Sequence, residues 1–292
     1  MQIHYCQPIN TSSSDNYVDF VYINGVLHSS TDGSGSLAPL NGVPGGGIGK
    51  FFALKPGTMQ LTFKRYKSRK LEDGTTVKDT ITIYDKPVEV KSGKQNVYVY
   101  DLTKDAIVLD NEYPYFETTR RMETLGTDSV ASVRLVNFLF ERVEYDEEGN
   151  PTYIPYEGKL QYQWRQYNTK DTLGYDEEGN PITEYQWKNL GEPVGFGECT
   201  KRCLVFVDKI NGISASGNNA SGYQAIYYRL LDENGEVLQG YWSSSTSKLS
   251  NYSDYWTAYI GRSYNHQLFG VRTSNKNNTT ETYARVANWT SH

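Results

Sequence analysis

Apolar and polar residues alternate with a period of two along much of this chain, which is the pattern of half-buried β-strands. Met59, Leu61 and Phe63 alternate with Gln60 and Thr62. Strands are predicted at residues 18–23, 51–54, 59–63, 80–84, 88–90, 97–100, 106–109, 133–140, 203–207, 222–231, 236–242, 256–260, 267–273 and 283–288. Because no segment shows sustained helical periodicity, the predicted fold class is all-β.

Short turn motifs separate several of these strands. Asn24-Gly25 is a strong hairpin signal, because both residue types tolerate the positive φ of a tight turn. Lys55-Pro-Gly57 predicts another turn, with glycine at the position that requires positive φ. The sequence Tyr-Asp-Glu-Glu-Gly-Asn-Pro occurs at residues 145–151 and again at 175–181. This duplication predicts two similar hairpin turns in the second half of the chain.

Two stretches of the chain show the same order of motifs, which predicts two related β-domains in tandem. In each stretch a short Gly-x-Gly motif precedes a strand, and a second strand follows further along. The chain has 292 residues, which is enough for two separate hydrophobic cores. The matched motifs are residues 47–49 and 195–197, 59–63 and 203–207, and 96–100 and 255–260.

The predicted organisation is all-β, with two tandem Ig-like or transthyretin-like β-sandwich domains. A linker is placed between them because the alternation fails there, and it contains a basic pair, Arg120-Arg121, that is a candidate protease target. The four parts are an N-terminal tether (1–14), the first β-sandwich (15–112), the linker (113–130) and a second β-sandwich with inserted hairpins (131–292).

Composition restricts the classes of partner. The chain contains 25 Tyr, 5 Trp and 10 Phe, and its mean hydropathy of -0.64 predicts thin cores with one solvated face on each sheet. A net charge of -5 argues against nucleic acid or an anionic membrane as a general partner. No apolar run approaches the roughly 20 residues that a membrane-spanning helix needs.

The three cysteines allow few roles. Cys6 precedes a polar, Ser-rich segment and is a candidate lipid-attachment residue, as in a mature bacterial lipoprotein. Cys199 and Cys203 lie about 13 Å apart if they occupy one strand, which is too far for a disulfide unless a tight turn joins them. We expect all three cysteines to be free thiols. No zinc site is expected, since no further ligands stand at suitable spacing.

No motif for catalysis or cofactor binding is found. Pro44-Gly-Gly-Gly-Ile-Gly-Lys50 departs from a phosphate-binding loop at both ends and leads into a predicted strand. The acidic turns lack the spacing of a calcium loop, so a surface-turn role is favoured over a metal site. No Ser-His-Asp or Cys-His arrangement is credible. We therefore predict that the chain is not an enzyme and has no catalytic residues, metal ion or cofactor.

Aromatic residues in the second half are the best lead to a binding function. Tyr162 and Trp164 share one side of a predicted strand, as do Tyr185 and Trp187. Two interpretations remain open. The four residues form an exposed platform for a glycan or a partner protein, or they point into the sandwich and form its core.

Several short motifs resemble one family. They are Ile23-Asn-Gly25, the Lys-Pro-Gly turn before residues 60–63, Val133-Arg-Leu-Val-Asn137 and Trp256-Thr-Ala-Tyr-Ile-Gly261. The resemblance is to Bacteroidota surface or periplasmic lipoproteins of unknown function with tandem Ig-like or transthyretin-like β-sandwich domains. It implies an extracytoplasmic location and covers most of residues 15–290. It implies no catalytic residues.

These observations favour a non-enzymatic cell-surface or periplasmic protein for adhesion, surface assembly or ligand capture. Its partner is expected to be a protein or a glycan at the cell surface, with membrane contact only through a lipid anchor at Cys6. One alternative is a structural component of a virion or another large assembly, made without an export signal. Another is a glycan-binding module that uses the aromatic residues of the second domain.

Overall fold

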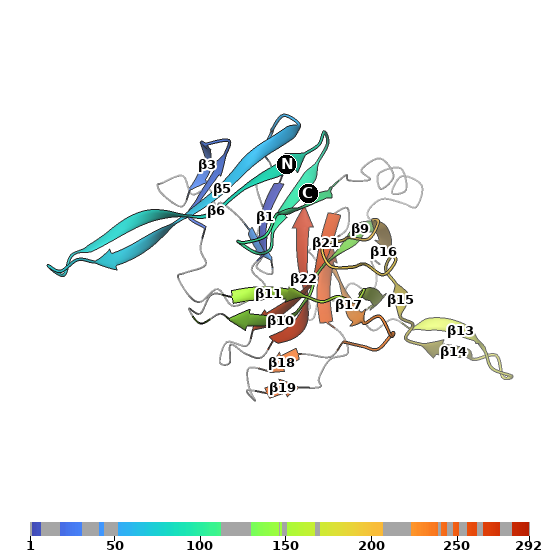
Figure 1. Ribbon diagram of the computed structural model, residues 1–292. Coiled ribbons are helices and arrows are strands. Elements are labelled where there is room, and N and C mark those ends of the chain that lie inside the picture. Colours follow the sequence, from blue (N-terminus) through green and yellow to red (C-terminus); the bar gives the residue numbers. More distant parts are fainter. Residues whose placement is uncertain are drawn as a thin grey trace. The chain divides into compact units, whose positions relative to one another are not determined.

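The computed structural model of the chain is built from β-strands (Figure 1). Every regular element in the described residues is a strand, which confirms the all-β class. The chain divides into two compact units, residues 1–112 with 145–153 (unit 1) and residues 113–144 with 154–292 (unit 2). The structure describes residues 2–6, 18–30, 41–43, 52–111, 130–145, 147, 151–166, 170–206, 223–238, 241–243, 248–250, 256–261, 265–274 and 282–291.

Unit 1 contains two four-stranded sheets. The first has the order β4-β1-β7-β8, with strands β1 (Gln2–Cys6), β4 (Asn41–Val43), β7 (Gln95–Val99) and β8 (Ile107–Asp110). The second has the order β3-β2-β5-β6, with strands β2 (Phe20–Ile23), β3 (Val26–Ser30), β5 (Gly57–Lys70) and β6 (Thr76–Val90). Strand β1 runs parallel to both of its neighbours, and the other pairings in these sheets are antiparallel.

The core of unit 1 joins its two sheets. Leu61 and Phe63 of β5 are fully buried while Gln60 is exposed, which confirms the alternation seen in the sequence. Val97 and Val99 of β7 are also fully buried and belong to the same hydrophobic cluster. Two sheets that share one apolar core in this way form a β-sandwich.

Two of the predicted turns in the described residues have the expected backbone. Asn24 and Gly25 join β2 to β3 with φ values of 50° and 76°. The Asn24 side-chain oxygen also accepts a hydrogen bond from the Gln60 N–H at 2.7 Å, which ties the turn to β5. Gly179 has a φ value of 82° in the turn between β13 and β14, as that turn requires. Gly57 also has a positive φ, 127°, but it is the first residue of β5 and its φ departs from the roughly 80° of the predicted turn.

Unit 2 also contains two four-stranded sheets. The first has the order β16-β9-β21-β22, with strands β9 (Val130–Phe138), β16 (Cys203–Phe206), β21 (Asn265–Ser274) and β22 (Thr282–Ser291). The second has the order β15-β12-β17-β20, with strands β12 (Gln161–Gln166), β15 (Lys188–Asn189), β17 (Tyr223–Leu231) and β20 (Trp256–Gly261). Only the β9–β21 pairing is parallel among those of these two sheets.

Three two-stranded sheets complete the described strands. They are β10 (Phe140–Tyr145) with β11 (Pro151–Pro155), β13 (Asp171–Tyr175) with β14 (Pro181–Glu184), and β18 (Tyr241–Ser243) with β19 (Lys248–Ser250). The first two carry the duplicated turn sequence. The hairpin prediction is therefore confirmed for β13–β14, whose turn residues are described.

The core of unit 2 again joins both sheets. Val133 and Leu135 of β9 cluster with Tyr162 of β12 and with Tyr228 and Leu230 of β17, and all five side chains are fully buried. Their alternation along β12 and β17 leaves the residues between them on the opposite face of the sheet. That opposite face carries the candidate site described below.

The two units have the same order of strands. When the two-stranded sheets are left out and strands are counted within each unit, both units have the sheet orders 4-1-7-8 and 3-2-5-6. The first strand runs parallel to the seventh in each. The units differ at the fourth strand, which is parallel to the first in unit 1 and antiparallel in unit 2.

This structural repeat corrects the match made from the sequence. By strand order β5 corresponds to β17, whereas the sequence motifs matched it to Cys203–Val207, which includes β16. Likewise β7 corresponds to β21 and not to β20. All strands of a sandwich share the same alternation, so motif order alone placed the match one strand out of register.

Other sequence-based boundaries also change. Residues 2–6 were expected in a tether but form β1, which pairs with β7. Residues 52–54 are not strand, although Phe52 is buried. Of the predicted strand 236–242, only Val237 makes an isolated bridge, and β18 begins at Tyr241. The expected linker at 113–130, with its Arg120-Arg121 pair, lies outside the described residues apart from Val130, the first residue of β9.

Candidate ligand-binding face of unit 2

The four aromatic residues proposed from the sequence do not form one platform. Tyr162 is fully buried, and its hydroxyl donates a hydrogen bond to the Val136 carbonyl at 3.4 Å. Trp164 packs against the same core. Tyr185 is 39% exposed, and Trp187 is half-buried and outside the core cluster. The four-residue platform is therefore wrong, because Tyr162 and Trp164 lie on the core side of β12.

The opposite side of β12 and β17 is polar and charged. The strand register places Gln163 opposite Arg229 and Arg165 opposite Tyr227. Residues that are directly opposite in an antiparallel pair lie on the same face, so these side chains are neighbours. We call this surface the outer face, and it comprises Gln161, Gln163 and Arg165 of β12 with Tyr227, Arg229 and Leu231 of β17.

Two arginines join the remaining aromatic residues to the outer face. The Arg165 guanidinium carbon lies 4.4 Å from the ring centre of Tyr185 and 5.2 Å from that of Trp187. It also lies 4.5 Å from the ring centre of Tyr227. The Arg229 guanidinium carbon is 4.5 Å from the Trp187 ring centre. Each contact contributes about 0.5–1 kcal/mol at such partly exposed sites. Together they hold the aromatic segment against the sheet.

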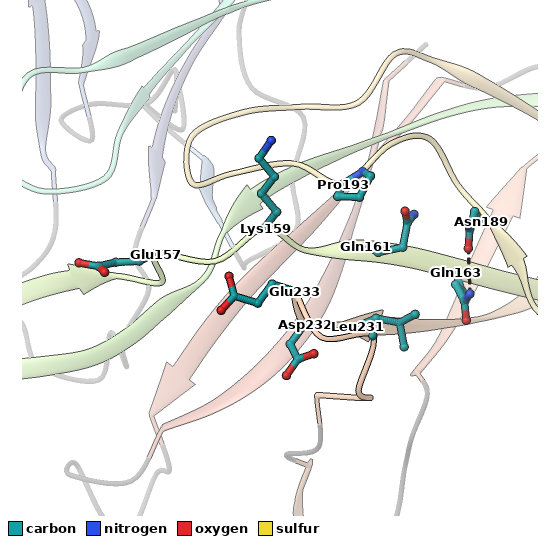
Figure 2. Close-up of a pocket in the computed structure, with 10 residues that line it drawn as sticks. Glu157, Lys159, Gln161, Gln163, Asn189, Pro193, Leu231, Asp232 and Glu233 are labelled. Carbon is teal, nitrogen blue, oxygen red and sulfur yellow. Dashed lines mark hydrogen bonds between the residues drawn. The ribbon is translucent and has the colours of Figure 1, made fainter.

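A groove of about 600 Å³ continues the outer face beyond the arginines. Figure 2 shows Gln161 and Gln163 along one strand, with Asn189 facing Gln163. The Gln163 amide nitrogen donates to the Asn189 side-chain oxygen at 2.8 Å, and the Arg229 Nε donates to the Gln163 oxygen at 2.7 Å. This hydrogen-bonded row connects the groove to the guanidinium that contacts Trp187.

The charged residues of the groove lining are mainly acidic. Glu157, Asp232 and Glu233 line it together with Lys159 (Figure 2). Burial raises the pKa of the adjacent Tyr156 phenol, and the negative charges of Asp232 and Glu233 raise it further. The groove is thus negative at this end, whereas the aromatic end carries the positive charges of the two arginines.

Two acidic turns in the described residues, at 176–180 and 232–236, are closed by hydrogen bonds to their own aspartates. The Asp176 carboxylate accepts hydrogen bonds from the N–H groups of Asn180 and Glu178 at 2.7 and 3.0 Å. These bonds, above all that from Asn180, lower the pKa of Asp176. Asp232 accepts two backbone N–H groups of its own turn in the same way. Among the described residues, no group of three or more His, Cys, Asp or Glu is placed to hold a metal ion.

The described cysteines form no redox pair. Cys199 and Cys203 are free thiols, as expected. Cys203 pairs with Val133 and Cys199 bridges to Val136 on the same strand, so the two cysteines are set well apart along β9. Burial raises the pKa of the Cys203 thiol. Cys6 is the last residue of β1, and lipid attachment to it stays a prediction.

Sequence reasoning missed the arginines and amides of the outer face. Arg165 and Gln163 alternate with the aromatic residues of β12, and Arg229 alternates with the buried residues of β17. That alternation was available in the sequence. It did not reveal that β12 and β17 are neighbours, which requires the pairing of strands about 65 residues apart.

Comparisons with family models, curated proteins and solved structures gave no significant match to this chain. In the described part of the chain, no helix has the length and apolar character needed to span a membrane.

Proposed function

We propose that this chain is a non-enzymatic binding protein and that the outer face of unit 2 captures a carbohydrate. One observation carries the proposal. The aromatic segment with Tyr185 and Trp187 is held beside a groove that is lined by side-chain amides, and a continuous row of contacts joins the two through Arg229 and Gln163.

The chemistry of this surface suits a sugar. A sugar ring has an apolar face of C–H groups and a rim of hydroxyls, each of which both donates and accepts hydrogen bonds. Partly exposed aromatic rings supply apolar area with a polar edge. Gln161, Gln163 and Asn189 supply amide groups that donate through nitrogen and accept through oxygen. A chain of two or three sugar units along β12 therefore meets both kinds of partner.

The acidic residues of the groove support binding more than hydrolysis. A glycosidase needs a fixed pair of carboxyl groups on opposite sides of the bond that is cleaved. The Asp232 carboxylate is instead held in its own turn by the N–H groups of Asn234 and Glu236, at 2.8 and 2.9 Å. This arrangement fixes the turn that forms one wall of the groove.

A glycan array probed with the full chain tests the proposal. We expect retention of a subset of glycans, and Trp187→Ala and Gln163→Ala should each reduce it about tenfold or more, by removing one stacking or hydrogen-bonding partner. Tyr22→Ala is a matched control, because Tyr22 is a half-buried aromatic in unit 1 with a lysine, Lys64, 4.8 Å from its ring centre. An array without signal, or equal losses in all three variants, would refute carbohydrate binding at this face.

We also propose that both units are Ig-like or transthyretin-like sandwiches of an extracytoplasmic lipoprotein. An anchor at Cys6 would have to leave the chain uncut before this residue, because Gln2–Cys6 forms β1 and pairs with β7. The paired four-stranded sheets and their common strand order support the fold proposal. Mass spectrometry of the protein isolated from its native membrane fraction tests the anchor. A peptide that contains unmodified Cys6 as its only form would contradict lipid attachment.

A further inference from the structure

A basic two-stranded ribbon extends from unit 1. Strand β2 pairs with β5 only between Leu61 and Lys64, and past that point β5 and β6 continue as a pair as far as Lys70 and Thr76 (Figure 1). We call residues 65–81 the basic arm. It contains five basic and three acidic residues, a net charge of +2 in a chain whose net charge is -5. The remaining residues therefore carry a net charge of -7.

One side of the basic arm combines positive charge with apolar surface. Arg65, Lys67 and Arg69 alternate along β5 and share one face. Their partners across the ribbon are Ile81, Asp79 and Val77, which lie on that same face. The Arg69 side chain pairs with Asp79. Val77 and Ile81 are only half-buried, so part of their apolar surface is accessible on this face of the arm.

A second hairpin, β13–β14, has the opposite charge. It projects from unit 2 (Figure 1) and spans residues 171–184, which include five acidic residues and no basic one. It also exposes large apolar side chains: Leu173 is 53% exposed, Tyr175 70% and Ile182 50%. Several exposed apolar side chains gathered on one projecting element are typical of an interaction surface. We call this element the acidic hairpin.

We propose that the basic arm of one copy of this chain binds the acidic hairpin of a second copy. Both elements are two-stranded ribbons, their net charges are opposite, and each offers apolar side chains beside its charged ones. Charge complementarity sets the orientation and the encounter rate of such a contact, and apolar contact supplies the affinity. The proposal does not depend on carbohydrate binding.

A second copy fits the basic arm better than a nucleic acid does. The tip of the arm carries Glu72 and Asp73, and the residues outside the arm have a net charge of -7. A long polyanion is repelled by such a surface, whereas a short acidic hairpin meets only the basic face. The segment that offers five acidic residues with exposed apolar neighbours is on the chain itself.

The contact joins two different surfaces, so it is heterologous, and a pair of copies still has one free arm and one free hairpin. Such contacts produce open chains or closed rings of subunits. Two narrow ribbons bury less than the roughly 1,200 Å² of a stable standard interface. We therefore expect weak association that strengthens with protein concentration and weakens with added salt.

Sedimentation velocity on the full chain at increasing concentration, in low and high salt, tests this proposal. The arm variant is Lys67→Glu with Arg69→Glu, both on the basic face of the arm, and the hairpin variant is Glu177→Lys with Glu178→Lys; all four side chains are exposed. Lys91→Glu with Lys104→Glu is the matched control, because it makes the same charge change at exposed positions outside the arm.

We expect the wild-type chain and the control to associate, and the arm and hairpin variants each to dissociate at about tenfold or more higher concentration. A mixture of the two variants should form pairs again, because the hairpin variant keeps the original basic arm and the arm variant keeps the original acidic hairpin. The altered arm (net charge -2) and the altered hairpin (net charge -1) do not attract each other, so the mixture should not grow beyond pairs. Three results would overturn the proposal: a wild-type chain that stays monomeric in low salt, variants that associate like the control, or a mixture that does not recover. Binding of the arm to a heparin column without self-association would assign it to a different partner.

Discussion

Replacing Tyr228 by phenylalanine is expected to stabilise unit 2. Tyr228 is fully buried in the core cluster, and its hydroxyl has no hydrogen-bond partner within the part of the chain that the structure describes. The same burial raises its pKa well above the usual value for tyrosine. A buried hydroxyl without a partner costs about 1–3 kcal/mol of stability, because it gives up hydrogen bonds to water and gains none.

The substitution removes that cost and leaves only a small void. A cavity the size of one oxygen atom costs a few tenths of a kcal/mol if the core does not relax. The expected net gain in the free energy of unfolding is therefore about 1 kcal/mol, which raises the melting temperature by about 2–4 °C for a domain of this size.

Tyr162→Phe is the matched control for this experiment. Tyr162 is fully buried in the same cluster, but its hydroxyl donates to the Val136 carbonyl at 3.4 Å, so its removal should cost up to about 1 kcal/mol. Thermal and urea unfolding of both variants, followed by tryptophan fluorescence, measure the difference. If Tyr228→Phe lowers stability as much as Tyr162→Phe does, the hydroxyl has a partner and the reasoning fails.

Three further predictions concern stability and pH. Trp164→Ala should lower the free energy of unfolding by about 3 kcal/mol, because the ring packs against the core. Trp187→Ala should lower it by about 1 kcal/mol, because that ring contacts the guanidinium of Arg229 outside the core. Equal losses of the two variants in urea unfolding would contradict the inward placement of Trp164 and the outward placement of Trp187. Burial raises the pKa of Tyr84 to about 12. The unfolded chain therefore releases this proton first, near pH 10, and stability should fall by up to about 1.4 kcal/mol per pH unit between pH 10 and 12. Tyr84→Phe should make this fall shallower, and an unchanged profile would speak against the shift. Asn96→Ala should cost about 2 kcal/mol, since the buried Asn111 amide donates to the Asn96 oxygen at 3.0 Å and Asn96 donates to the Tyr98 hydroxyl at 2.9 Å. This loss is measured by urea unfolding followed by circular dichroism, since all five tryptophans lie in unit 2 and Asn96 lies in unit 1. A loss below about 0.5 kcal/mol, the smallest net value of a hydrogen bond, would contradict a role for this network.

Much of the local structure follows from the sequence because its causes are local. The alternation at Met59, Leu61 and Phe63 predicts both the strand and its buried side, and Asn24-Gly25 predicts the turn that joins β2 to β3.

The same alternation cannot tell which strands pair. Short strands of similar composition are interchangeable in a motif match, so the tandem repeat was matched one strand out of register. The alternation also does not tell whether the aromatic side of a strand points into the core or toward solvent, because both arrangements have the same period of two. Tyr162 and Trp164 are assigned to the core only once β12 is paired with β17 and packed over β9.

The sequence by itself determined that this protein is all-β, where most turns lie, and which residues alternate on each strand, because these depend on neighbours a few positions apart. Tertiary structure decided the rest. Arg165 and Arg229 are 64 positions apart and share one face only because their strands are neighbours in a sheet, and Trp187 reaches both from a third segment. Long-range pairing brings these groups together, and burial selects which side of each strand remains available to a ligand.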